Sequence, residues 1–369
     1  MRKYYTIFFS AVIISMLLAP MTVNPSTANA ITSTGPIPMP GNLIPIPNPN
    51  SPPISSSLPN LGTVSIALPD SIYSINLVRP GLDASDPLNN ETKTQQELLA
   101  NQQFWTYGGD AIAEKAPYDF YKDTQGLHIG VQAPANGTWA GFYAVSPNTN
   151  AALFHTVITT PVSSIPYQWY ENGLYVQTSR PFINYVSCFS STSVFGTVWS
   201  VGSVTGNATE GTQFTPLWTD TSMNQPLTRD CTIITNGNNY LKVYLDGTMV
   251  YTNSTLNLQM PAPFNAFLEP QSSYNGQLLN GIYKDYYATS DENIKIGNLP
   301  SNAARVDLVD STGTVLVTGK VSSGVVSLDV GKYHFPLACT IKVYDSNNVL
   351  IASTSGTVNI YGGNAYAPS

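Results

Sequence analysis

Charged side chains are scarce in this sequence. Of its 369 residues, 15 are Lys or Arg and 22 are Asp or Glu, which makes 10% charged, whereas an average globular protein has about 25%. The few basic residues form no cluster, and the formal net charge is −7. Nucleic acids and anionic membrane surfaces both bind clusters of Lys and Arg. We therefore expect neither of them as a partner.

Cysteine and histidine are also rare, with three of each. No C-x-x-C pair and no Cys/His spacing typical of zinc sites occurs, and we predict neither a metal site nor a cofactor. In an oxidising compartment Cys188 and Cys231 can form a disulfide, although the sequence leaves the pairing open. Cys339 lies in an apolar run, FPLACTIKV, and is expected to be a buried thiol.

The first thirty residues have the pattern of a secretory signal peptide. Arg2-Lys3 precedes an apolar stretch over 4–21, and Ala28-Asn29-Ala30 fits the small-x-small cleavage rule. We expect cleavage there and an extracellular mature chain, secreted or held at the cell surface. A retained anchor is the alternative, but Pro20 interrupts an apolar stretch that is short for a bilayer. No later segment is apolar and long enough to insert into a membrane.

Residues 31–62 contain nine prolines. Proline lacks the backbone N–H and disfavours helix in the residue before it, so this segment is expected to be an extended linker. A proline-rich ligand for an aromatic groove is the alternative.

Residues 63–298 are rich in Ser, Thr, Asn, Gly and Tyr and are expected to form the main domain. One short helix is predicted at about 94–103, because Thr94 and Glu97 make a capping box. Short apolar runs bounded by Gly, Pro, Asn and Asp follow, and they predict strands.

An Asn-Gly pair at 172–173 predicts a β-hairpin over 167–178, because this dipeptide favours the two-residue type I′ turn. The pairing would turn Trp169, Leu174 and Val176 toward the core. The opposite face would carry amides and tyrosines: Gln168, Tyr170, Tyr175 and Gln177.

Asp246-Gly247 predicts a second hairpin over 240–252, in which Leu245 pairs with Thr248 and Tyr244 with Met249. Its outward face would carry Tyr240, Lys242, Tyr244, Met249 and Tyr251. Sugar rings stack on tyrosine while amides bind their edges, so the outward faces of both hairpins are candidate ligand-binding surfaces. Strand propensity and cross-strand packing would explain the same tyrosines without any ligand.

The stretch LKVYLDGTMVYTN (241–253) resembles a hairpin of laminin-G-like and concanavalin-A-like sandwiches. DENIKIG (291–297) is similar to the closing strand in many of them, and FWTYGGD (104–110) resembles their first strand. The resemblance covers roughly 104–298. It implies an all-β fold, an antiparallel two-sheet jelly-roll sandwich.

A second unit is expected over 299–360, where alternating patterns predict six short strands in about sixty residues. This fits a small Ig-like or transthyretin-like β-sandwich, followed by a tail over 361–369. Asp307 and Asp310 could suggest a structural calcium ion, but their spacing fits a hairpin turn better.

The sequence carries few signs of catalysis. It has no GxSxG, HExxH or P-loop motif, and His128, His155 and His334 each lie in an apolar strand and are expected to be structural. The resemblance raises the question of a glycosidase, but the E-x-D-x-E run that such enzymes often carry is missing. Isolated acids remain at Glu114, Glu171, Glu210, Glu269 and Asp285. Among them, Glu269 is the candidate to watch, because it lies in an apolar segment.

Three functions stay open. The first is a non-catalytic protein that binds a glycan or another extracellular polymer, and the second is a glycoside hydrolase or polysaccharide lyase. The third is a structural component of the cell envelope. Two carboxylates facing each other would favour the enzyme, and an aromatic-lined groove without them would favour binding.

Overall fold

A computed structural model describes residues 66–67, 74–77, 82–162, 168–178, 184–207, 211–220, 222, 224–290, 292–354, 356–363 and 365–368. The expected signal peptide over 1–30 and linker over 31–62 lie outside the described residues. No helix in the described ranges is long and apolar enough to cross a membrane.

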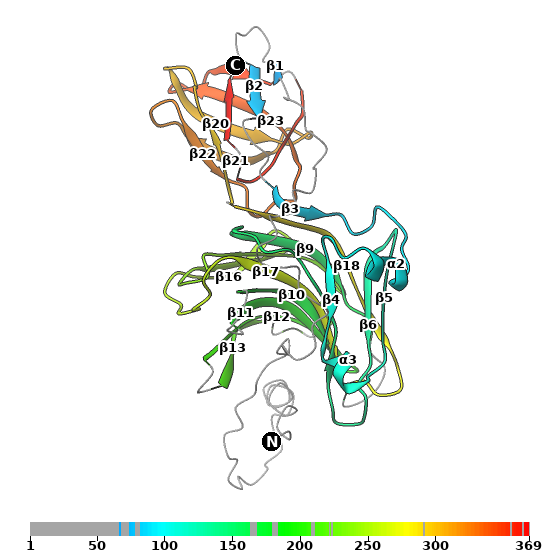
Figure 1. The fold of residues 1–369 in the computed structure, drawn as a ribbon. Coiled ribbons are helices and arrows are strands. Elements are labelled where there is room, and N and C mark those ends of the chain that lie inside the picture. Colours follow the sequence, from blue (N-terminus) through cyan, green and yellow to red (C-terminus); the bar gives the residue numbers. More distant parts are fainter. Residues whose placement is uncertain are drawn as a thin grey trace.

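Two antiparallel sheets pack face to face and form the main unit (Figure 1). The first, which we call the β10 sheet, has the order β13-β12-β11-β10-β17-β8-β4, with β7 beside β17. Its strands are β4 (Thr106–Gly108), β7 (Ala140–Gly141), β8 (Tyr143–Val145), β10 (Tyr170–Thr178), β11 (Tyr185–Ser193), β12 (Gly196–Asn207), β13 (Gly211–Thr219) and β17 (Phe264–Ser272).

The second, the β9 sheet, has the order β16-β15-β14-β9-β18-β6-β5, with β3 beside β18. Its strands are β3 (Leu82–Asp86), β5 (Tyr118–Asp123), β6 (Gly126–Val131), β9 (Leu153–Thr159), β14 (Thr228–Thr235), β15 (Leu241–Leu245), β16 (Thr248–Asn253) and β18 (Leu279–Thr289). The expected all-β, two-sheet jelly-roll sandwich is thus confirmed.

Alternate side chains of both sheets fill the space between them. Trp199, Phe120 and Phe154 are among the fully buried members of this core, and burying one such side chain stabilises the fold by about 1.5–3 kcal/mol. Within the described residues, two short helices lie at the start of the unit. α2 (Gln95–Ala100) begins with the expected capping box between Thr94 and Glu97, whereas α3 (Asp110–Glu114) was not expected.

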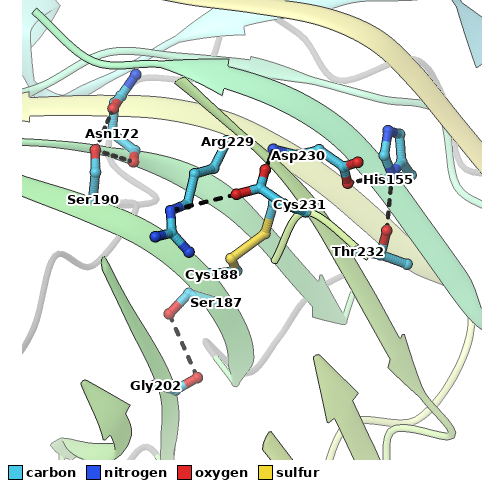
Figure 2. Close-up of a disulfide and its surroundings, with 11 residues drawn as sticks. His155, Asn172, Ser187, Cys188, Ser190, Gly202, Arg229, Asp230, Cys231 and Thr232 are labelled. Carbon is cyan, nitrogen blue, oxygen red and sulfur yellow. Dashed lines mark hydrogen bonds and ion pairs between the residues drawn. A yellow bond between two sulfur atoms is a disulfide. The ribbon is translucent and has the colours of Figure 1, made fainter. Parts of the chain in front are cut away.

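A disulfide joins Cys188 of β11 to Cys231 of β14, and Figure 2 shows it between the two sheets. The Cα atoms are 6.6 Å apart, the sequence separation is 43, and both residues are fully buried. The bond therefore ties the β10 sheet to the β9 sheet. Cys339 is free and buried, and burial raises the pKa of its thiol to about 12.

The prediction of a hairpin at Asn172-Gly173 is wrong, because both residues lie inside the unbroken strand β10. That strand pairs with β11 on one side and β17 on the other. Gly173 serves close packing instead of a turn, since a Cβ there would lie 2.5 Å from the Cβ of Phe189. The Asn172 amide donates to the carbonyl of Thr159 in the other sheet, and its Oδ1 accepts from Ser190.

The hairpin expected at Asp246-Gly247 is confirmed. Leu245 pairs with Thr248 and Tyr244 with Met249, and both turn residues have positive φ, 49° and 70°, as a type I′ turn requires. A bulge between Val243 and Tyr244 then shifts the register. Val243 pairs with Tyr251 as a result, and Tyr251 packs against the core instead of facing outward.

A smaller unit follows, also built from two sheets, with the orders β1-β2-β26-β19-β22 and β21-β20-β23-β24, the latter with β25 beside β23. It has its own hydrophobic core. The first sheet contains β1 (Ile66–Ala67), β2 (Ser74–Leu77), β19 (Asn293–Ile296), β22 (Val326–Asp329) and β26 (Ala365–Pro368). The second contains β20 (Ala303–Val309), β21 (Val315–Lys320), β23 (Leu337–Asp345), β24 (Leu350–Ser353) and β25 (Val358–Ile360).

Several residues expected in the main unit belong to the smaller one, because their strands pair there. β19, expected to close the main sandwich, pairs with β22 and β26, and its residues Ile294 and Ile296 are buried in the smaller core. β2 pairs with β26, and β1 with β2, so residues 66–67 and 74–77 also belong there. The turn at Asp310 is as expected, since its Oδ1 accepts from the backbone N–H of Thr312 and Thr314. The likeness of this unit to Ig-like or transthyretin-like domains stays a prediction.

The smaller unit packs on the face of the β9 sheet that points away from the main core (Figure 1). Tyr287 of β18 donates a hydrogen bond to the carbonyl of Tyr333 at 3.1 Å, and its ring contacts Phe335 at a centroid distance of 5.2 Å. Lys242 of β15 forms an ion pair with Glu292 at 2.9 Å. These contacts make a junction of aromatic and charged side chains between the two units.

Candidate functional site

Two glutamates lie on the face of the β10 sheet that points away from the β9 sheet. We call this the outward face. In Figure 1 strands β10, β11 and β12 curve, and the concave side of the sheet is the one turned away from the β9 sheet. In the register of β10 with β17, Gly173 is opposite Glu269, and Glu171 is opposite Gln271. Glu171 and Glu269 are therefore diagonal neighbours on one face. The Cα atoms of such neighbours are about 7–8 Å apart.

A third carboxylate joins them from α3. The Oδ1 of Asp110, the first residue of α3, accepts a hydrogen bond of 2.5 Å from the N–H of Gly141 in β7. A Cβ at Gly141 would lie 3.0 Å from Oε1 of Glu269 and 3.3 Å from Oδ1 of Asp110. The missing side chain at Gly141 thus lets two carboxyl groups from distant segments approach the same point.

The three carboxylates are bonded to neutral groups. Gln271 donates to Oε1 of Glu269 at 2.9 Å, and Ser191 donates to Oε1 of Glu171 at 3.0 Å. The other oxygen of Glu269 is buried without a partner. Within the described part of the chain, no Lys, Arg or His forms an ion pair with any of the three. A buried carboxylate without a cation is unstable in its charged form, so this face favours protonated acids.

The pKa values of the three groups follow from this environment. Burial raises the pKa of Glu171 to about 7, against a smaller lowering by the Ser191 hydrogen bond. Burial raises the pKa of Asp110 to about 6, although the Gly141 N–H opposes it. Burial and the neighbouring charge of Asp110 hold the pKa of Glu269 well above its usual range. Near neutral pH the face therefore combines a protonated Glu269 with acids that lose their protons more easily.

Aromatic rings surround the carboxylates on the same face. They form a cluster apart from the main core, made of Tyr143, Tyr175, Tyr185, Phe189 and Phe267, with Phe214 packed against them. Tyr175 contacts the rings of Tyr185 and Phe189, and its hydroxyl is buried without a partner. Apolar rings beside carboxyl groups and amides are the surroundings that a sugar ring needs, with C–H faces to stack and hydroxyls to bond.

The residues expected to bind a ligand do not come together. Glu269, Tyr175 and Gln177 lie on the outward face, but Tyr170 points into the core between the sheets and is fully buried. Gln168 precedes the strand and accepts from the backbone N–H of Asn275. The candidates on the second hairpin, Tyr240, Lys242 and Tyr244, lie at the junction with the smaller unit, and Tyr251 packs against the main core. Sugar contact at these residues stays a prediction, and the two hairpins do not form one surface.

Glu171 and Asp110 are the residues that sequence reasoning undervalued. In the sequence Glu171 is only an isolated acid, because 98 positions separate it from Glu269 along the chain. Asp110 gave no signal of its own beyond its place in FWTYGGD. Only the pairing of β10 with β17, and of β17 with β7, brings the three groups to one face.

A cavity of about 500 Å³ lies elsewhere. It is lined by amides, glycines and apolar side chains: Asn184, Gly206, Asn236, Gly237, Asn238, Gln259, Met260 and Pro261. None of these is ionisable, so the cavity lacks the groups for acid–base chemistry and we place the candidate site on the outward face.

No protein-family model matches the sequence, and no curated protein matches it. Solved structures with a similar sandwich include β-agarase A from Zobellia galactanivorans (TM-score 0.43, 12% identity, 60% of this chain and 94% of that one). They also include the laminarinase catalytic domain from Thermotoga maritima (0.38, 11%, 56% and 96%) and a carbohydrate-binding module from Bacillus subtilis (0.33, 9%, 52% and 98%). Similarities this low concern the sandwich fold and carry no argument on activity.

Proposed function

We propose that this chain is an extracellular glycoside hydrolase whose outward face on the β10 sheet binds a polysaccharide and cleaves it. The observation that carries the proposal is the group of three carboxyls, the buried Glu171 and Glu269 and the half-buried Asp110, on one sheet face without a cationic partner in the described chain. Carboxylates with raised pKa values that gather at one place are typical of active sites. The structure thus favours the second of the three functions left open by the sequence.

The roles follow from the protonation states. Glu269, kept protonated by burial and by the charge of Asp110, would donate its proton to the glycosidic oxygen as the bond breaks. Glu171, with a pKa of about 7, would accept a proton from the water that attacks the anomeric carbon. Each step moves one proton, and the next turnover begins once solvent has restored both groups. The cluster around Tyr175 would hold the sugar ring.

A screen of residues 31–369 on a panel of polysaccharides tests this proposal. We expect release of reducing ends by the wild-type chain and a loss of about 10²–10⁴-fold in Glu269→Gln and Glu171→Gln. Glu91→Gln is the matched control, because Glu91 is a partly exposed acid that pairs with Lys93 and Lys122 at the far edge of the β9 sheet. Since Glu171 and Glu269 are each 2% exposed, product release would also show that this face opens to a polymer.

Non-catalytic glycan binding is the second candidate, favoured by the aromatic cluster on the same face. It predicts retention on a polysaccharide without product, unchanged in Glu269→Gln and weakened in Tyr175→Ala. If the chain is not retained on any polymer and releases no product, both candidates are refuted. The structural envelope role is then favoured.

A further inference from the structure

Three residues that no part of the proposed chemistry uses converge where the two units meet. They are His155 on β9, Asp230 on β14 and His334, which lies between β22 and β23 in the smaller unit. One ring nitrogen from each histidine and one carboxylate oxygen all lie within 4.8 Å of one another. The two histidine rings contact each other edge to face at a centroid distance of 4.4 Å.

We infer that His155, Asp230 and His334 form a Zn²⁺ site that joins the main unit to the smaller one. Two imidazoles and one carboxylate match the ligands that zinc takes at about 2.0–2.2 Å, often with water in the fourth position. Calcium and magnesium prefer all-oxygen sites. The ligand set therefore points to zinc or a similar transition metal rather than to a hard cation.

The side chains are held for this role by the strands beneath them. In the register of β14 with β9, Thr232 is opposite His155, and its hydroxyl lies 2.8 Å from Nδ1 of the imidazole (Figure 2). The same Nδ1 is 3.6 Å from Oδ1 of Asp230, while Oδ2 of Asp230 contacts Nε2 of His334. Tyr287 stacks on the His155 ring at 4.5 Å and fixes its plane. Nδ1 of His155 is hydrogen-bonded to Thr232, and Nε2 of His334 to Asp230, so a zinc ion bound here would replace these contacts and displace the proton shared by His334 and Asp230.

Charge and access also suit a cation. The negative charges of Asp285 and Asp246 act on His334 together with that of Asp230. His155 is buried, whereas the side chain of His334 is 47% exposed and that of Asp230 18% exposed. An ion could enter from the solvent past His334, and a water molecule could complete its coordination on that side.

The test is zinc titration of the purified chain, prepared without a histidine tag and freed of metal with a chelator. Isothermal titration with ZnCl₂ should show one ion per chain with a micromolar or tighter Kd, while CaCl₂ and MgCl₂ give no heat. Zinc should raise the unfolding temperature by several degrees, because an ion bound only to the folded state stabilises it.

His334→Ala should lower zinc affinity at least tenfold and abolish the thermal shift, and it should fold because His334 is a half-exposed loop residue. His128→Ala is the matched control, since His128 pairs with Asp123 within the main unit and should leave zinc binding unchanged. Absence of binding by the wild-type chain, or equal binding by wild type and His334→Ala, would overturn the inference. The measurement needs no polysaccharide, so its outcome does not depend on the hydrolase proposal.

Discussion

Gly173 of β10 stands directly opposite Glu269 of β17. Phe189 of β11 is opposite Gly173 on the other side. A side chain at 173 would collide with Phe189. Close packing of β10 against β11 therefore depends on this glycine, beside one of the two glutamates.

Gly173→Ala should destabilise the chain, because the new Cβ would lie 2.5 Å from the Cβ of Phe189 and 2.8 Å from the carbonyl oxygen of Cys188. Overpacking of this kind costs about 1–3 kcal/mol. Urea unfolding would measure the loss. Gly356→Ala is the control, since nothing lies within 4 Å of a Cβ there, and equal stability of the two variants would contradict the packing account.

Stability should fall as the pH rises, because of Glu171. Its pKa is about 7 in the folded chain against 4.5 for the ordinary group, so the folded state keeps a proton that the unfolded state loses between these values. The free energy of unfolding should therefore decrease through this window by about 3 kcal/mol.

Glu171→Gln removes that titration. It should stabilise the chain at pH 8 and change little at pH 4, where wild-type Glu171 is protonated in both states. Denaturant unfolding at the two pH values measures this, with Glu91→Gln alongside. If wild type and Glu171→Gln show the same pH dependence, Glu171 does not have the raised pKa.

If Glu171 acts as a base on water, as proposed, hydrolysis should invert the anomeric configuration. In inverting enzymes the two carboxyls are about 6.5–9.5 Å apart, which leaves room for that water, whereas in retaining enzymes they are about 5–5.5 Å apart. Proton NMR of the first products distinguishes the two anomers. Retention would mean that one carboxylate acts as a nucleophile instead.

Loss of the Cys188–Cys231 bond should be costly. The bond closes a loop with a sequence separation of 43, for which chain entropy predicts a loss of about 4 kcal/mol. The double variant Cys188→Ala/Cys231→Ala should therefore unfold at markedly lower denaturant concentration. Cys339→Ala, which removes a buried free thiol, is the control for loss of a buried sulfur. If the double variant unfolds at the same denaturant concentration as the wild-type chain, the disulfide contributes little.

Local signals in the sequence predicted local structure well. Thr94 with Glu97 starts a helix, and Asp246-Gly247 makes the expected turn, because such features depend on neighbours a few residues apart. Asn172-Gly173 carries an equally strong turn signal, yet packing against Phe189 and Thr159 overrides it. The closing strand at Asn293–Ile296 was misplaced for a similar reason, since its apolar alternation fits either core.

The candidate site could not be predicted in full, because nothing in the sequence relates Asp110, Glu171 and Glu269. Cross-strand register places them on one face, and register depends on the whole sandwich. The same holds for His155, Asp230 and His334, whose spacing along the chain fits no metal motif. Glu269 alone stood out, because an acid inside an apolar strand is unusual wherever the strand lies.

The smaller unit covers the β9 sheet, and the candidate site lies on the opposite side of the sandwich, on the β10 sheet (Figure 1). A polymer lying across the strands around Glu171 and Glu269 would therefore not meet the smaller unit at either end. Such a layout suits attack at internal linkages of a long chain rather than trimming from its tip. It also leaves the smaller unit free to hold the protein against a surface on the side opposite Glu171 and Glu269.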